Sequence, residues 1–189
     1  DKGIHGKKKK RRRKKGKEKE VECDKEEVGD IAEAGDTGIE KEKVPCARYG
    51  HTLVVHPLRS LECFLFGGCD NEGCALDDVW EYHTVTQDWK WVGKGPQGRS
   101  YHSCVVWLDS LVVFGGQSNG IFNDLHVYDC TSQTWSSPPQ SGEIPSPRFG
   151  HSAVTYLDYM YIYGGYTTDG FCVNDLYAYH ITSGRWAKR

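Results

Sequence analysis

One pattern of fourteen residues recurs three times in this 189-residue chain and constrains its fold more than any other feature. The copies read LDDVWEYHTVTQDW at 76–89, FNDLHVYDCTSQTW at 122–135 and VNDLYAYHITSGRW at 173–186. A pair of adjacent glycines precedes each copy, and the pairs recur at intervals of 48 and 49 residues. A period of this length indicates a fold in which similar units stack side by side, each contacting mainly its neighbours.

The residues around these markers have the character of β-strands. From Val44 onward, short runs of β-branched and aromatic residues are separated by glycine, and no apolar spacing of about 3.6 residues lasts long enough to form a helix. Each repeat contains four runs, which predicts twelve strands in three groups. The runs are HTLVV, LECFLF, VWEYH and DWKWV, then HSCVVW, SLVVFGG, DLHVYD and QTWSS, then HSAVTY, YMYIYGG, DLYAYH and GRWAKR.

The order of the markers resembles the kelch repeat. Each unit shows Arg-x-x-His, an apolar strand, a second apolar strand ending in Gly-Gly, a variable loop, an Asn/Asp-Asp pair followed by Tyr, and then Trp. The resemblance covers residues 44–189 and implies an all-β, kelch-type β-propeller with four antiparallel strands in each blade. The expected blades are 44–92, 93–139 and 140–189. The first has three extra residues around VHPLRSL, and the second reads RSYHS where the others read RYGHT and RFGHS.

Most of the marker residues have a structural explanation. The glycine pairs end a strand where positive φ and the absence of Cβ let the chain turn beside neighbouring backbone. The aromatic markers would fill the wedge between blades, each burying about 150–250 Å². These structural positions are Gly67, Gly68, Gly115, Gly116, Gly164, Gly165, Trp89, Trp135, Trp186, Tyr82, Tyr128 and Tyr179.

Three histidines and three aspartates also recur at fixed positions. The histidines, which could be mistaken for a metal triad, stand on three different repeats, so a buried hydrogen-bonding role is expected for His51, His102 and His151. The aspartates are expected to bond local backbone and to cap turns. They are Asp78, Asp124 and Asp175.

No enzymatic activity or cofactor is expected from the sequence. It contains no H-E-x-x-H, G-x-S-x-G or Walker motif. Some proteins that resemble kelch propellers are enzymes, including a copper oxidase with a Tyr–Cys crosslink and iron-dependent specifier proteins, but their ligand residues cannot be matched here. We therefore assign no catalytic and no metal-binding residue. The eight cysteines include no CxxC pair and are interpreted as reduced, packed thiols.

The first 43 residues differ from the rest in composition. Residues 1–20 carry 12 Lys and Arg and three acids, for a net charge of +9, whereas residues 21–43 carry nine acids and three lysines. Low hydrophobicity and runs of like charge predict a disordered tail. Its basic run is interpreted either as a solvated segment or as a nuclear import or non-specific nucleic-acid signal. The run is Lys7, Lys8, Lys9, Lys10, Arg11, Arg12, Arg13, Lys14 and Lys15.

The positions that the repeat leaves free are expected to bind partners. The loops after the glycine pairs vary in length and content, and in proteins that resemble this one such loops and the connectors between blades form the interaction face. An arginine in each connector could hold a carboxylate of an acidic peptide, or could stack on Tyr49, Tyr101 or Phe149 and fix the turn. The expected binding residues are Arg48, Arg99, Arg148, Gln117, Asn119, Tyr166 and Thr168.

Two functions follow from these features. The first is a non-enzymatic protein-interaction module, such as a substrate receptor, adaptor or scaffold, with an intracellular location in cytoplasm or nucleus. The second is a nuclear or ribosome-associated factor that uses its basic tail. Three blades do not close a propeller of four to eight blades, and the chain starts at Asp1. We therefore expect about three further repeats in a longer protein, or pairing of two chains.

Overall fold

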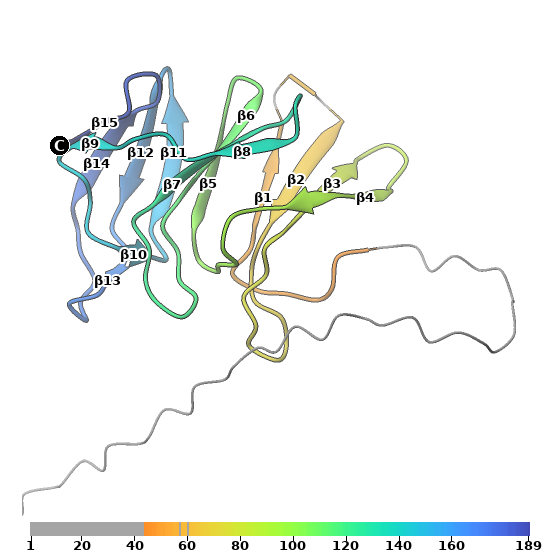
Figure 1. Ribbon diagram of the computed structural model, residues 1–189, viewed down its shortest axis with the longest axis horizontal. Helices are drawn as coiled ribbons and strands as arrows, with labels where there is room; N and C mark the ends of the chain where they lie inside the picture. The colour runs from red at the N-terminus through yellow and green to blue at the C-terminus, as the bar shows by residue number, and fades with distance from the viewer. Residues whose placement is uncertain (1–43, 57, 60) are drawn as a thin grey trace, which may run out of the picture. The chain divides into compact units, whose positions relative to one another are not determined.

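The computed structural model describes residues 44–56, 58–59 and 61–189. Everything described belongs to one unit, residues 38–189, and its regular structure is all β (Figure 1). This confirms the predicted fold class. The predictions for the tail at 1–43, including its basic run, lie outside the described residues. Within the described part there is no helix with the length and apolar character needed to span a bilayer.

Three antiparallel sheets form the blades, and each follows chain order from its first strand to its last (Figure 1). Blade 1 consists of β1 (Thr52–Val55), β2 (Glu62–Phe66), β3 (Asp78–His83) and β4 (Trp89–Lys94). Blade 2 consists of β5 (Ser103–Trp107), β6 (Ser110–Phe114), β7 (Leu125–Asp129) and β8 (Thr134–Ser136). Blade 3 consists of β11 (Ser152–Tyr156), β12 (Tyr159–Tyr163), β14 (Leu176–His180) and β15 (Arg185–Lys188). The residues at which one blade passes to the next, 92/93 and 139/140, stay predictions.

Three two-residue strands were not predicted. The connector into blade 3 contributes β9 (Ser141–Gly142), which pairs in parallel with β15 and makes this sheet five-stranded. The indole of Trp186 donates a hydrogen bond to Gln140 at 2.7 Å, and a side chain at Gly142 would collide with the Trp186 carbonyl, so only glycine fits there. The other two, β10 (Arg148–Phe149) and β13 (Tyr166–Thr167), pair with each other beside the same blade.

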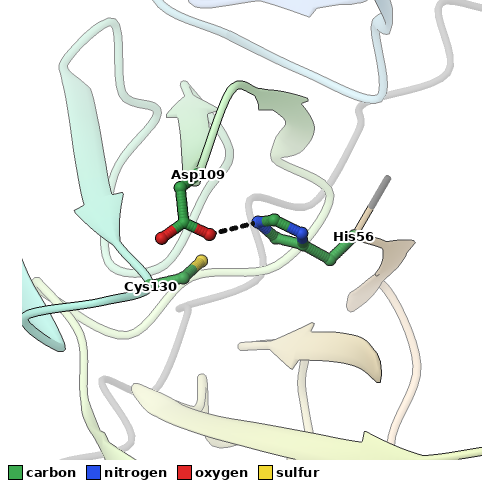
Figure 2. A group of neighbouring side chains, drawn as sticks. All are labelled: His56, Asp109 and Cys130. Atoms are coloured by element: carbon green, nitrogen blue, oxygen red, sulfur yellow. Dashed lines mark ion pairs between the residues drawn. The ribbon is translucent and has the colours of Figure 1, made fainter. Parts of the chain in front are cut away.

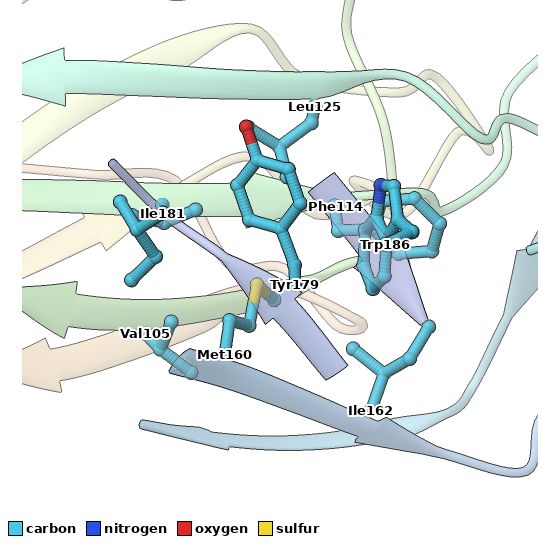
Figure 3. Packing of buried hydrophobic residues seen from close by; sticks show 9 residues of the cluster. Val105, Phe114, Leu125, Met160, Ile162, Tyr179, Ile181 and Trp186 are labelled. Carbon is cyan, nitrogen blue, oxygen red and sulfur yellow. The ribbon is translucent and has the colours of Figure 1, made fainter. Parts of the chain in front are cut away.

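The hydrophobic core lies between the blades. One cluster joins blades 2 and 3, where Trp186 meets Phe114 with ring centroids 4.9 Å apart (Figure 3). A second cluster joins blades 1 and 2, where Trp135 meets Phe66 at 5.1 Å. In both, the aromatic ring at the end of the second strand of one blade packs against the tryptophan of the next. We call each of these contacts a seam.

The glycine pairs have the backbone conformation that their motif implies. All six glycines have positive φ, between +63° and +102°. At Gly116 a Cβ would stand 2.8 Å from the Cβ of His102, because the loop folds closely over that histidine. A larger residue would therefore displace the connector that enters the blade.

Candidate partner-binding face

The three connector arginines are engaged inside their own blades. Arg99 donates from Nη1 and Nη2 to the two carboxylate oxygens of Asp124 at 2.7 and 2.9 Å, and from Nη1 to the Gly115 carbonyl at 3.0 Å. The corresponding bonds join Arg48 to Asp78 and Arg148 to Asp175. Each guanidinium thus ties the connector to the glycine pair and to the start of the third strand.

Burial makes these pairs part of the fold. Arg99 and Arg148 are fully buried, with 0% of their surface exposed. Burial alone would raise the pKa of Asp124, but the bonds from Arg99 and His126 outweigh it and hold that pKa below its usual range. The hydrogen bond from Arg148 likewise lowers the pKa of Asp175. Both carboxylates are therefore ionised at neutral pH, as a bidentate pair with arginine requires.

This arrangement corrects the sequence-based roles of both residue types. The arginines were expected to bind a partner's carboxylate or to stack on the aromatic residue of their own connector. Two of them do stack on rings, but Arg99 lies over Phe122 and Arg148 over Tyr177. The aspartates, expected to cap turns, accept from the arginines. The signal in the sequence was an arginine followed by an aspartate in every repeat, at separations of 30, 25 and 27 positions.

Above these pairs, the connectors present a row of aromatic side chains. Ring centroids are 6.1 Å apart between Tyr49 and Tyr101, 6.1 Å between Tyr101 and Phe149, and 5.4 Å between Phe149 and Tyr166. Backbone bonds hold the row together across blades, because Tyr101 donates to the Gly50 carbonyl and accepts from the amide of Gly150. The row therefore crosses all three blades at one end of the unit, where β10 and β13 lie (Figure 1). We call Tyr49, Tyr101, Phe149 and Tyr166 the aromatic row.

The aromatic row is open to solvent and bordered by the variable loops. Tyr49, Tyr101 and Tyr166 are 49%, 39% and 40% exposed. Of the residues predicted to bind partners, Tyr166 belongs to the row and Gln117 pairs with the connector residue Ser100 through two backbone bonds of 2.9 Å. The other two loop residues predicted, Asn119 and Thr168, are exposed in the same loops. The structure thus brings the loop residues to this face and keeps the arginines beneath it.

The histidines that precede the first strands of blades 2 and 3 each contact a hydroxyl group of the blade before. His102 Nε2 stands 2.8 Å from the hydroxyl oxygen of Thr52 in blade 1, and His151 Nε2 stands 2.8 Å from that of Ser103 in blade 2. Burial lowers the pKa of His102 to about 3 and that of His151 to about 4, so both rings are neutral at physiological pH. The predicted buried, hydrogen-bonding role is confirmed for these two. It is wrong for His51, which is exposed because no blade precedes it in the described chain.

A group of three potential metal ligands lies at the seam of blades 1 and 2. His56, Asp109 and Cys130 bring one ligand atom each to within 4.8 Å of one another (Figure 2). His56 Nε2 stands 2.8 Å from Asp109, while Nδ1 accepts a backbone hydrogen bond from Arg59. Since Nδ1 accepts, Nε2 carries the hydrogen of the neutral ring and has no lone pair for a metal ion.

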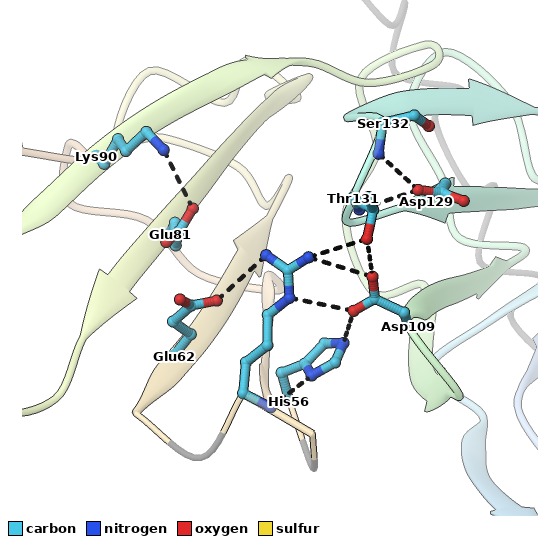
Figure 4. Close-up of polar contacts among 9 residues, drawn as sticks. His56, Glu62, Glu81, Lys90, Asp109, Asp129, Thr131 and Ser132 are labelled. Atoms are coloured by element: carbon cyan, nitrogen blue, oxygen red, sulfur yellow. Dashed lines mark hydrogen bonds and ion pairs between the residues drawn. The ribbon is translucent and has the colours of Figure 1, made fainter.

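The other two members of this group also have defined surroundings within the protein. Asp109 accepts hydrogen bonds from the Thr131 hydroxyl and the Arg59 guanidinium, which together lower its pKa (Figure 4). Burial raises the pKa of the Cys130 thiol to about 12, so the thiol is protonated at neutral pH in the metal-free protein. At the equivalent position of the next seam, the Trp107 indole replaces the histidine and donates a hydrogen bond to Asp158 at 3.2 Å. We interpret the His56–Asp109 contact, 2.8 Å long, as a polar contact that joins the two blades.

The blades, their seams and an exposed loop face define the class of this chain as a β-propeller protein, of which three blades are seen. Comparison with known proteins specifies it further. The family model described as the KLHDC2/KLHL20/DRC7 Kelch-repeats domain matches residues 35–189. The chain belongs to this kelch-repeat family, whose members are typically protein-interaction domains.

The chain is similar to parts of curated proteins whose names differ widely. The chain is 31% identical over 149 residues, 74% of its length, to the dynein alpha chain of the flagellar outer arm of Chlamydomonas reinhardtii, of which this covers 3%. It is 32% identical over 96 residues, 51% of its length, to the host cell factor homolog hcf-1 of Caenorhabditis elegans, covering 12%. It is 34% identical over 110 residues, 56% of its length, to acyl-CoA-binding domain-containing protein 4 of Arabidopsis thaliana, covering 16%. The chain thus spans less than a fifth of each of these relatives.

Proposed function

We propose that the aromatic row and its bordering loops bind an extended segment of a partner protein, and that the chain acts as a substrate receptor, adaptor or scaffold. The single observation that supports this is the row itself, four rings in succession of which three are more than a third exposed. Tyrosine is enriched at protein interfaces, because its side chain has an apolar ring and a polar hydroxyl. It buries a large surface area while it has few rotatable bonds.

The charge around the row supports a basic partner segment. The loop after the first glycine pair carries Asp70 and the exposed Glu72, and the loop after the third carries the exposed Asp169. The connector arginines are already neutralised by their aspartates. A segment carrying lysine or arginine therefore fits this face better than the acidic peptide expected from the sequence, since cations are attracted both by ring faces and by carboxylates.

A displayed library of random peptides tests the proposal even though the natural partner is unidentified. Binders selected on the chain should be enriched in lysine, arginine and aromatic residues, and their affinity is then measured by fluorescence polarisation. Tyr101→Asn is the informative variant, because the backbone φ at Tyr101 is +54° and asparagine tolerates this conformation. We expect it to weaken binding by about 5-fold or more, since a central interface tyrosine that forms a hot spot contributes over 1 kcal/mol.

A matched control separates this effect from loss of structure. Leu157, 73% exposed, lies in the turn between β11 and β12, at the other end of the strands from the row. Leu157→Asn should leave the affinity unchanged. Selected binders that are acidic, or that bind the Tyr101→Asn variant as tightly as the original chain, would contradict the proposal.

A further inference from the structure

The turn that joins the first two strands of each blade carries exposed leucines. In blades 2 and 3 this turn has two residues, of which the first is Leu108 or Leu157. In blade 1 the longer turn carries Leu58 and Leu61. Leu58, Leu61, Leu108 and Leu157 are 71%, 45%, 61% and 73% exposed. We call these four residues the leucine turns.

The leucine turns lie at the end of the blades opposite the aromatic row (Figure 1). The strands stop at this end, so the turns are not part of the sheet faces that neighbouring blades cover. Leu108 shows this directly, because blade 2 packs against a blade on either side and the leucine is still 61% exposed. Its exposure therefore follows from its place in a turn.

Neither packing nor turn conformation explains a leucine at these sites. Backbone φ is +51° at Leu108 and +54° at Leu157, in the left-handed region that glycine and asparagine tolerate and bulky residues rarely adopt. Both side chains are thus held in a costly conformation while they point into solvent. Backbone strain of this kind gathers at functional sites.

Polar contacts between blades fix the positions of the turns. Asp109, which follows Leu108, lies 2.8 Å from His56 Nε2 and accepts a hydrogen bond from Arg59 Nε at 3.1 Å, both from blade 1 (Figure 4). Asp158, which follows Leu157, accepts a hydrogen bond from the indole of blade 2 at 3.2 Å. The leucines therefore stand on a frame that is already ordered, which lowers the entropic cost of binding.

The charges beside the leucines indicate what they bind. Asp158 and Asp129 are exposed at this end of the blades, and within the described residues neither forms an ion pair. Arg59 is already paired with Asp109 and Glu62. The surface thus combines apolar side chains with carboxylates that lack a cation. It attracts lysine and arginine and repels anionic lipid headgroups.

We propose that the leucine turns are a second docking surface, which binds a protein segment that presents aliphatic side chains beside lysine or arginine. The leucines bury the aliphatic side chains of that segment, and Asp129 and Asp158 pair with its cations. The surface lies at the opposite end of the blades from the aromatic row and does not depend on the function proposed for the row. The chain can therefore hold two segments at once, one at each end.

A displayed peptide library tests the proposal when the selection is confined to this surface. The original chain is the immobilised target. An excess of a soluble Leu108→Gly, Leu157→Gly double variant captures peptides that bind elsewhere, including those that bind the aromatic row. The selected peptides should be enriched in leucine, isoleucine, lysine and arginine. Their affinity, measured by fluorescence polarisation, should be about 10-fold or more weaker for the double variant, because two apolar side chains are removed from the interface.

Two measurements separate binding from folding and from the aromatic row. Glycine suits the positive φ at both sites, so the urea midpoint of the double variant should equal or exceed that of the original chain. A lower midpoint would show that the leucines support the fold and would overturn the proposal. Tyr101→Asn, at the other end of the blades, should leave the affinity of the selected peptides unchanged.

Three other results would also overturn the proposal. The first is a selection that enriches no peptide, and the second is one that enriches acidic peptides. The third is cosedimentation with vesicles of phosphatidylcholine and phosphatidylserine that is seen for the original chain and lost in the double variant. That result would assign the leucine turns to a lipid surface instead of a protein.

Discussion

Acidification should destabilise the unit through its two seam histidines. The pKa of His102 is lowered to about 3 and that of His151 to about 4, from 6.5, because burial disfavours their charged forms. As the pH falls, the unfolded chain therefore binds protons at these two histidines before the folded chain does. The contribution of the neutral rings to the free energy of unfolding is complete above pH 6.5. It is lost as the pH falls below 6.5, and the loss levels off near the folded pKa of each ring.

The size of the effect follows from these values. One pKa unit corresponds to about 1.4 kcal/mol, so between pH 7 and pH 5 each histidine should cost about 2 kcal/mol of unfolding free energy, or about 4 kcal/mol together. This is a large share of the stability of a domain, which is about 5–15 kcal/mol. The aspartates paired with the connector arginines do not interfere, because their pKa values are lowered from 3.8 and their contribution is lost only at lower pH.

Urea unfolding at pH 7, 6 and 5, followed by tryptophan fluorescence at one chain concentration and ionic strength, measures this loss. His102→Gln keeps an amide near the Thr52 hydroxyl and removes the titrating ring, so it should halve the loss to about 2 kcal/mol. His51→Gln is the matched control and should change the slope less, because solvent reaches that ring. Equal losses in the original chain and in His102→Gln would refute the reasoning.

Two further predictions test the interpretation of the polar groups. Arg99→Met should cost about 2 kcal/mol of unfolding free energy, because the Gly115 carbonyl and the Asp124 carboxylate lose the bonds from the guanidinium, while Asp124 keeps its contact with His126. A urea midpoint within error of that of the original chain would show that the pair is not structural. Excess Zn²⁺ should leave the urea midpoint unchanged, because the His56 ring presents a hydrogen and no lone pair to Asp109. Absorbance from a thiolate-bound Co²⁺ ion that is lost in Cys130→Ser would contradict this.

Several features of the fold could be predicted because they are local and repeated. The period of the glycine pairs and tryptophans gave twelve strands of the right type, since strand alternation and turn glycines act over a few residues. The packing role of Trp135 and Trp186 followed from their position in every repeat. The two-residue strands at 141–142, 148–149 and 166–167 were missed because their pairing depends on a neighbouring segment.

The candidate site could be predicted only in part. The loops were identified because they vary where the repeat does not, and they do lie together at one end of the blades. The arginines were assigned to a partner because a sequence does not show that Asp124 lies 2.7 Å from Arg99. The aromatic row was missed for a similar reason, because Tyr49, Tyr101 and Phe149 belong to three repeats and meet only when the blades stand side by side.

The sequence by itself determined that this chain folds into repeated four-stranded blades with aromatic residues between them, since these properties are encoded within each repeat. The tertiary structure alone decided which charges neutralise each other and which rings face solvent. The physical reason is that these contacts join residues from 17 to more than 50 positions apart. Their energy depends on burial and neighbouring blades, which no local pattern specifies.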